Sequence, residues 1–221
     1  MLRELQGTIL HAARCLMNRN RSKGFTLIEL LITIAVFLVL VGLGVPSFMS
    51  ALKNSKLNAD YSQLIGALYL ARSEAVKRSG SVTVCARQTD NSCGDDWNNG
   101  WLVFTDNTQG APGTVGTAGT VDGTDEILSI SPPLDGRRLS AKGTLSPNPS
   151  SAGNAVDQTE IIYSSTGGSS WSGGTFVMCD DRGEEHAVTT NLALTGDIRK
   201  GRSRNGDIPV DVHGLDVECP T

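Results

Sequence analysis

The stretch GFTLIELLITIAVFLVLVGLGVP, residues 24–46, decides how this chain is organised. From Phe25 to Val45 it is apolar apart from a single acid, Glu29. At a rise of about 1.5 Å per residue, such a run is long enough to cross the hydrocarbon core of a membrane as a helix. The preceding residues 17–24, MNRNRSKG, contain basic but no acidic side chains, which predicts a cytoplasmic amino end and an exported remainder.

The small residue Gly24 precedes the apolar run, whereas the cleavage site of an ordinary secretory signal follows it. The motif GFTLIELL resembles the class III signal of type IV pilins and type II secretion pseudopilins. The resemblance implies that a prepilin peptidase cuts between Gly24 and Phe25 and methylates the new amino group of Phe25. It also implies that Glu29 acts in filament assembly, with the ammonium of a neighbouring subunit's Phe25 as its partner.

Glu29 is also unusual on physical grounds. A carboxylate near membrane depth costs roughly 2.5–3.5 kcal/mol on insertion scales, so a partner for it is expected. The alternative is a plain membrane anchor that tolerates one acid near the start of the helix, where the helix dipole favours negative charge.

The pattern divides the chain into a leader at 1–24, a long helix at 25–79 whose membrane part is 25–46, and a head at 80–221. Within the leader, Met17 offers a second start that leaves a compact basic leader. We expect translation to begin there.

The second part of the predicted helix is amphipathic. Pro46 predicts a kink or local melting, after which the helical period resumes. Apolar residues then recur at three- and four-residue steps and are predicted to pack on the head: Leu57, Tyr61, Leu64, Ile65, Leu68, Ala71 and Ala75.

From Ser81 onward the hydrophobic period changes to two, which predicts short antiparallel strands. The predicted strands are 81–86, 100–105, 126–131, 160–165, 175–179, 186–190 and 192–195. The stretches 107–124 and 146–157, rich in small and polar residues, are predicted to be loops because they cannot build a core. The expected fold class is α+β and type IV pilin-like, with the long N-terminal helix packed on an antiparallel β-sheet head.

The cysteines indicate an exported head. The chain has five, of which Cys15 lies in the leader. The remaining four, an even number, predict two disulfides. Three pairings are open on sequence alone, and we favour Cys85 with Cys93 and Cys179 with Cys219. Four zinc ligands are the alternative, but the chain contains no C-x-x-C motif, so no metal is expected.

A tryptophan motif follows Cys93. The pattern W-x-x-G-W-x-V-F-x-D at 97–106 resembles the head of the GspH/FimT branch of pseudopilins and minor pilins. We expect Trp97, Trp101 and Phe104 to fill the end of a small sheet. A surface aromatic that stacks on nucleic-acid bases is the alternative.

Near the carboxyl end, four cations gather within six residues: Arg199, Lys200, Arg202 and Arg204. The chain has a net charge of −4, so any nucleic-acid binding must rest on a local patch of this kind. Arginine side chains match phosphate oxygens, and neutralising phosphates releases counterions. The segment resembles the G-R-x-R motif of FimT-type minor pilins, which implies DNA binding during natural transformation. The alternative is a solvated charge run, flanked by Asp197 and Asp207.

No catalytic motif is present, so the sequence predicts neither an enzyme nor a cofactor. The resemblance implies a single-pass inner-membrane protein with a periplasmic head, later incorporated into a pilus or pseudopilus. Its expected partners are other pilin subunits, prepilin peptidase and DNA. The alternative function is a structural minor pilin or type II secretion pseudopilin that primes assembly without binding DNA.

Overall fold

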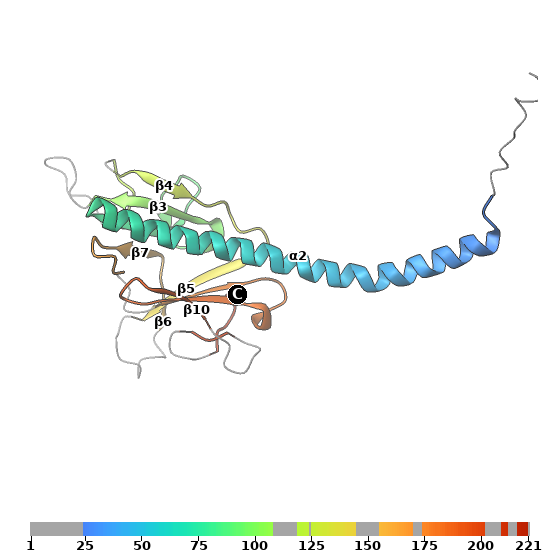
Figure 1. Cartoon of the computed structure of the whole chain (residues 1–221). Helices are drawn as coiled ribbons and strands as arrows, with labels where there is room; N and C mark the ends of the chain where they lie inside the picture. Colours follow the sequence, from blue (N-terminus) through green and yellow to red (C-terminus); the bar gives the residue numbers. More distant parts are fainter. Residues whose placement is uncertain are drawn as a thin grey trace, which may run out of the picture. The chain divides into compact units, whose positions relative to one another are not determined.

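The computed structural model describes residues 24–107, 119–123, 125–144, 155–169, 174–201, 209–211 and 216–220. The chain has two compact units, Met1–Met49 and Ser50–Thr221. Helix α2 (Leu27–Arg78) begins in the first unit and ends in the second (Figure 1). Pro46 lies inside α2 and does not end it.

In the first unit, α2 begins with a side-chain cap. The backbone N–H of Glu29 donates to Thr26 Oγ1 at 3.3 Å, which satisfies one of the free amide groups of the first turn. All residues from Phe25 to Met49 are exposed. This end of α2 is long and apolar enough to cross a membrane, in agreement with the predicted membrane part.

The second unit contains two five-stranded antiparallel sheets among its described residues. Sheet A has the order β2-β1-β3-β4, with β7 paired to β1 as well. Sheet B has the order β10-β9-β8-β5-β6. The strands of sheet A are β1 (Ser81–Arg87), β2 (Cys93–Gly94), β3 (Trp101–Asp106), β4 (Ile127–Ile130) and β7 (Glu160–Tyr163); those of sheet B are β5 (Arg138–Thr144), β6 (Ala155–Asp157), β8 (Gly174–Cys179), β9 (Val188–Leu192) and β10 (Ile198–Lys200). Two short 3-10 helices, η1 (Trp97–Asn99) and η3 (Glu184–His186), lie in the connections.

The main core joins both sheets to one face of α2 (Figure 1). The buried helix residues are Leu57, Leu64, Ala67, Leu68, Ala71 and Ala75, and Tyr61 and Ile65 pack against them. The predicted apolar stripe is therefore confirmed, and so is the α+β architecture of a long helix on an antiparallel head. Removing apolar side chains from water in this way is the main term that stabilises the head.

The strand predictions were partly wrong. Six of the seven predicted strands lie on or within two residues of an observed strand. The seventh, 192–195, contains only the last residue of β9 and then a turn: Ala193 N–H donates to Asp197 O at 2.9 Å, and Gly196 N–H donates to Ala193 O at 2.8 Å. Strands β2, β5, β6 and β10 were missed, and β6 falls inside the predicted loop 146–157.

Candidate functional site

Two disulfides fix the head. Cys85 bonds to Cys93 and Cys179 bonds to Cys219, the pairing favoured from the sequence. The second disulfide closes a 40-residue separation and holds the C-terminal tail on β8. There Val217 joins a small apolar cluster with Val177, Cys179 and Ala187.

The tryptophan motif links the two sheets. Asp96 caps η1 by accepting from the N–H of Asn98 at 2.9 Å. The next residue, Trp97, packs its ring edge-on against Phe176 of β8, with centroids 5.2 Å apart, and its Nε1 donates to Gln158 O at 2.7 Å. Trp97 is 3% exposed and Trp101 is 1% exposed. The core role is thus confirmed, and neither ring is accessible to stack on a base.

Strand β10 places two of the four predicted DNA-binding cations on opposite faces of sheet B. Arg199 pairs in register with Asn191, and Lys200 pairs with Thr190. Successive strand residues point to opposite faces. Ile198 and Lys200 therefore share the face that packs on the core, where the Lys200 ammonium lies 5.7 Å from the centroid of the Tyr61 ring of α2. Arg199 is on the other face, so these two cations do not form one patch.

Arg199 is accessible but already paired. Its Nε donates to Asp197 Oδ2 at 2.8 Å, and 80% of the Arg199 side chain is exposed. An exposed ion pair of this kind is worth at most about 1 kcal/mol, so a phosphate can displace the carboxylate. The other two predicted cations, Arg202 and Arg204, lie outside the described residues.

Close packing against neighbouring segments explains the glycine at position 201 in the basic segment. Its N–H donates to Thr189 O at 2.9 Å, which extends the pairing of β10 with β9. A Cβ at Gly201 would lie 1.8 Å from Thr189 Oγ1 and 2.9 Å from Val210 O. Only a glycine can approach the neighbouring strand and the tail this closely.

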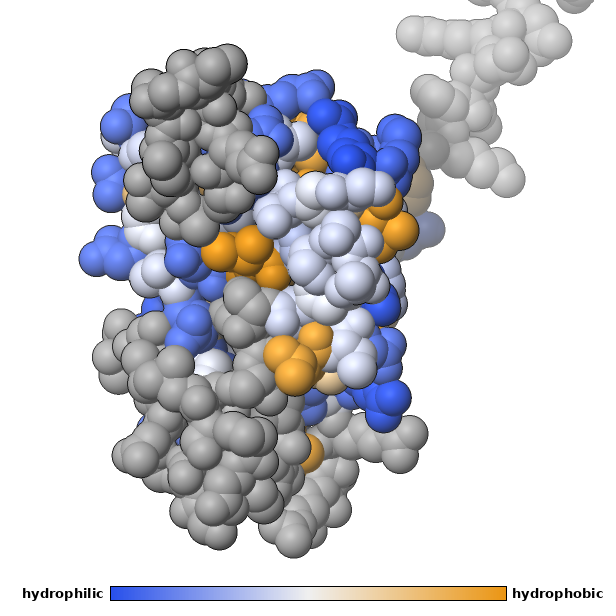
Figure 2. All heavy atoms as spheres, turned by 90° about the vertical axis from the view of Figure 1, so that its left-hand side faces the viewer, coloured by the Kyte–Doolittle hydropathy of each residue, from blue (hydrophilic) through white to orange (hydrophobic). Residues whose placement is uncertain are grey.

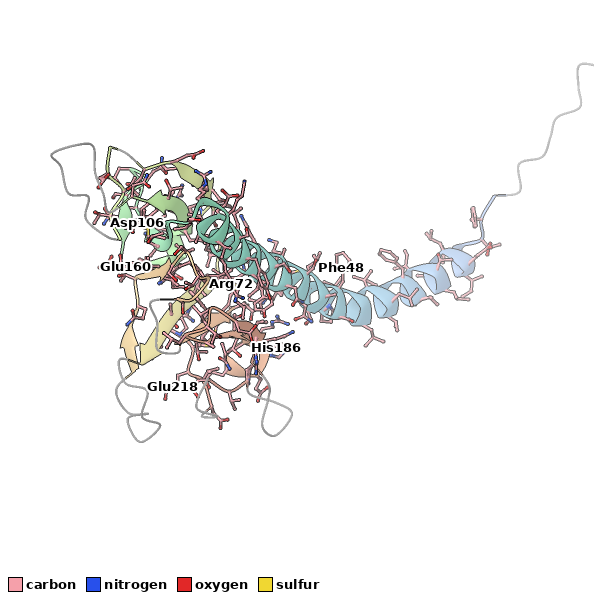
Figure 3. All side chains as sticks on the ribbon, turned by 60° about the vertical axis from the view of Figure 1, so that its left-hand side comes forward. Phe48, Arg72, Asp106, Glu160, His186 and Glu218 are labelled. Carbon is pink, nitrogen blue, oxygen red and sulfur yellow. A yellow bond between two sulfur atoms is a disulfide. The ribbon has the colours of Figure 1, made fainter. Side chains whose placement is uncertain are left out.

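Sequence reasoning missed Arg72, which anchors the hairpin between β9 and β10. Arg72, labelled on α2 in Figure 3, donates from Nε to Gly167 O and from Nη2 to Thr195 O, both at 3.0 Å. Gly196, with φ of 73°, lies so close to Gly167 that a Cβ there would be 2.1 Å from its carbonyl oxygen. The two acceptors are about a hundred residues from Arg72 along the chain, so no local pattern reveals this contact.

Asp180 and Glu160 are two head carboxylates whose pKa values are shifted in opposite directions. Burial raises the pKa of Asp180, but hydrogen bonds from the Arg182 guanidinium and backbone outweigh it and hold the pKa below its usual value. Asp180 is only 5% exposed, so this ion pair lies largely out of contact with water. Burial, followed by the charge of Asp106, raises the pKa of Glu160 (both labelled in Figure 3).

Within the described ranges, no group of three or more His, Cys, Asp or Glu side chains is placed to hold a metal ion. A hollow of about 380 Å³ lies between η1, β5 and the tail. Its charged lining residues are Asp95, Asp96, Lys142 and Glu218. This mixture of charges gives the hollow no preference for an anion.

Residues 61–196 match the family model of the type II transport protein GspH, and residues 19–45 match the prokaryotic N-terminal methylation motif. No match to the chain is found among curated proteins. Among solved structures, the chain is similar to the type IV minor pilin FimU of Pseudomonas aeruginosa (strain PAO1), with a TM-score of 0.47 and 16% identity over 72% of this chain and 96% of that one. The minor pseudopilin EpsH from the type 2 secretion system of Vibrio cholerae gives a TM-score of 0.38 and 12% identity over 66% of this chain and 95% of that one.

Proposed function

The chain belongs to the GspH family of type II transport proteins, and from this premise we propose that it is a minor type IV pilin that binds DNA without sequence preference during natural transformation. The family comprises minor pilins and pseudopilins, which are membrane-anchored subunits that assemble with other pilin subunits. The basic segment at 199–204 supports the DNA-binding part of the proposal.

The N-terminal methylation motif supports the processing steps. In the proposed pathway, prepilin peptidase cuts between Gly24 and Phe25, and Phe25 becomes N-methylated. The helix from Phe25 onward then holds the protein in the inner membrane with its head in the periplasm. Glu29 recognises the amino group of a neighbouring subunit during assembly, because an unpaired carboxylate at this depth is costly.

One observation carries the DNA-binding proposal: the basic segment begins on β10, which is the outermost strand of sheet B among the described residues. At an edge, long cationic side chains reach phosphates on either side of the strand. Arg199, Lys200, Arg202 and Arg204 are the proposed contacts, and contacts to phosphates carry no base information.

The test is a DNA titration of the full mature chain in a neutral detergent at several salt concentrations. Arg202→Gln and Arg204→Gln each lower the affinity for every sequence, and each reduces the slope of log affinity against log salt by roughly 0.7–0.9. Lys142→Gln is the matched control, because Lys142 is an exposed cation on β5 of the same sheet. Unchanged binding and unchanged transformation in the double arginine variant contradict the proposal.

A second function is favoured by one specific observation: the family match ends at residue 196, before the basic segment. In this alternative the protein is a structural minor pilin or type II secretion pseudopilin that primes filament assembly. The purified chain then retains no DNA, and deletion of the protein reduces piliation or secretion.

A further inference from the structure

In the head, helix α2 meets the segment from Thr195 to Lys200, which includes β10, at two points, and we call the strip between these points the seam. Arg72 contacts Thr195 at one end of the seam, and Tyr61 contacts Lys200 at the other. The helix advances about 16 Å between its two contact residues, Tyr61 and Arg72. The seam therefore runs along about 16 Å of the helix, between the turn that precedes β10 and the end of β10.

The helix side of the seam is aromatic and aliphatic. Tyr61, Ile65 and Tyr69 follow at four-residue steps, so they lie in one row on α2. Tyr61 and Ile65 pack against the core, whereas Tyr69 is 49% exposed. A half-exposed phenol ring anchored on a helix offers a flat surface to a ligand.

The charge in the seam is positive. Lys200 has no ion-pair partner among the described residues, and its ammonium is held over the Tyr61 ring. The nearby helix carboxylates are engaged elsewhere, since Asp60 pairs with Arg137, and Glu74 pairs with Lys77 and Arg78. Asp197 pairs with Arg199 on the opposite face of β10. The seam thus presents an aromatic ring and a cation. Among the described residues, each of these three neighbouring carboxylates already has a cationic partner.

We propose that this seam binds single-stranded nucleic acid, with a base stacked on Tyr69 and a backbone phosphate at Lys200. The inference rests on the proposed DNA binding and deepens it by naming the form of the ligand and its path. Cations that follow the backbone, combined with aromatic rings that accept bases, are the combination that single strands require. A base in an intact duplex is already stacked and paired, so it cannot use Tyr69.

The experiment compares an oligothymidylate with a duplex of the same length, each titrated into the full mature chain in neutral detergent. The native chain binds the single strand more tightly. Tyr69→Ser lowers single-strand affinity at least about five-fold and leaves duplex affinity unchanged, whereas Tyr69→Phe keeps the ring and the affinity. Lys200→Gln reduces the single-strand salt slope by roughly 0.7, and Lys142→Gln changes neither measurement.

The outcomes separate this inference from the proposed function. Two results contradict the proposed single-strand site at the seam without contradicting the proposed DNA binding. In the first, the native chain binds duplex at least as well as the single strand. In the second, Tyr69→Phe loses as much affinity as Tyr69→Ser. If the chain binds neither form, the proposed function fails, and this inference fails with it. The melting temperature of each variant is measured alongside, because a change at the half-exposed Tyr69 should leave it unaltered.

Discussion

The two parts of α2 have the same backbone geometry but opposite relations to their surroundings. From Phe25 to Met49 every residue is exposed and almost all are apolar, so this part depends on composition and needs no particular neighbour. From Ser50 to Arg78 one face is buried against two sheets, and residues as far away as Arg137 and Thr195 contact the helix. A composition-dependent segment should tolerate apolar exchange, whereas a contact-dependent segment should not.

The exposed surface shows the same contrast. Among the described residues of the head, the exposed large apolar ones are few: Leu52, Tyr69, Val76, Ile127, Ile130 and Leu194. In the view of Figure 2, the hydrophobic side chains form small separate patches among polar ones. An apolar segment exposed on every side requires a lipid or protein environment, whereas this head surface is suited to water.

The largest expected effect comes from the same truncation in the two parts of the helix. Leu68→Ala lowers the free energy of unfolding of the head by about 2–5 kcal/mol, because Leu68 is fully buried and its removal leaves a cavity. Leu40→Ala leaves the unfolding of the head unchanged. Urea denaturation of the full chain, followed by the fluorescence of the buried Trp97 and Trp101, measures both. Equal losses in the two variants contradict the division of the helix.

For the introduction of a charge, the apolar part of α2 is expected to be the more sensitive of the two parts. Val36→Arg, near the middle of the apolar part, costs roughly 2.5–3.5 kcal/mol of insertion free energy and lowers the fraction of protein that resists alkaline extraction from membranes. Ser62→Arg, on the exposed face of the second part, changes neither extraction nor head stability by more than about 0.5 kcal/mol. If Val36→Arg remains fully membrane-bound while Ser62→Arg does not, the proposed anchor is misplaced.

Local patterns were sufficient to predict the helix, its apolar stripe and the buried tryptophans. Each of these depends on residues close in sequence, such as the i, i+4 repeat or the Asn-Asn-Gly turn. Strand β5 was missed because its sequence RLSAKGT places only Leu139 and Ala141 in the core, while Arg138 and Lys142 are exposed. A pattern of two apolar residues in seven is too weak to identify a strand.

The candidate site was less predictable for a related reason. Spacing alone places Arg199 and Lys200 in one cluster, but the pairing of β10 with β9 assigns them to opposite faces. The pairing of β10 with β9 and the contacts of Arg72 both join separate segments of the chain. Neither segment alone carries a pattern that predicts its partner. Electrostatic neighbours such as Asp197 could be anticipated, whereas the position of Lys200 over Tyr61 could not.

The last comparison is between two carboxylates within the head, and Glu160 is the one with the smallest expected effect. The folded-state pKa of Asp180 is lowered, so its stabilising contribution is present above the unfolded pKa of about 3.9 and is lost as pH falls through the lower folded value. The folded-state pKa of Glu160 is raised, so its ionised form costs stability above that value. The cost disappears as pH falls towards the unfolded pKa of about 4.3.

The two amide variants should therefore respond to pH in different ways. Asp180→Asn lowers the melting temperature at pH 7 and still does so at pH 4, because it leaves the Arg182 guanidinium without its buried partner. Glu160→Gln raises the melting temperature at pH 7 by a small amount, and the gain vanishes near pH 4, where the native carboxyl is also neutral. Calorimetry of the full chain at both pH values measures the two differences. If Glu160→Gln still raises the melting temperature at pH 4, the charge of the Glu160 carboxylate is not the cause of its unfavourable contribution to stability.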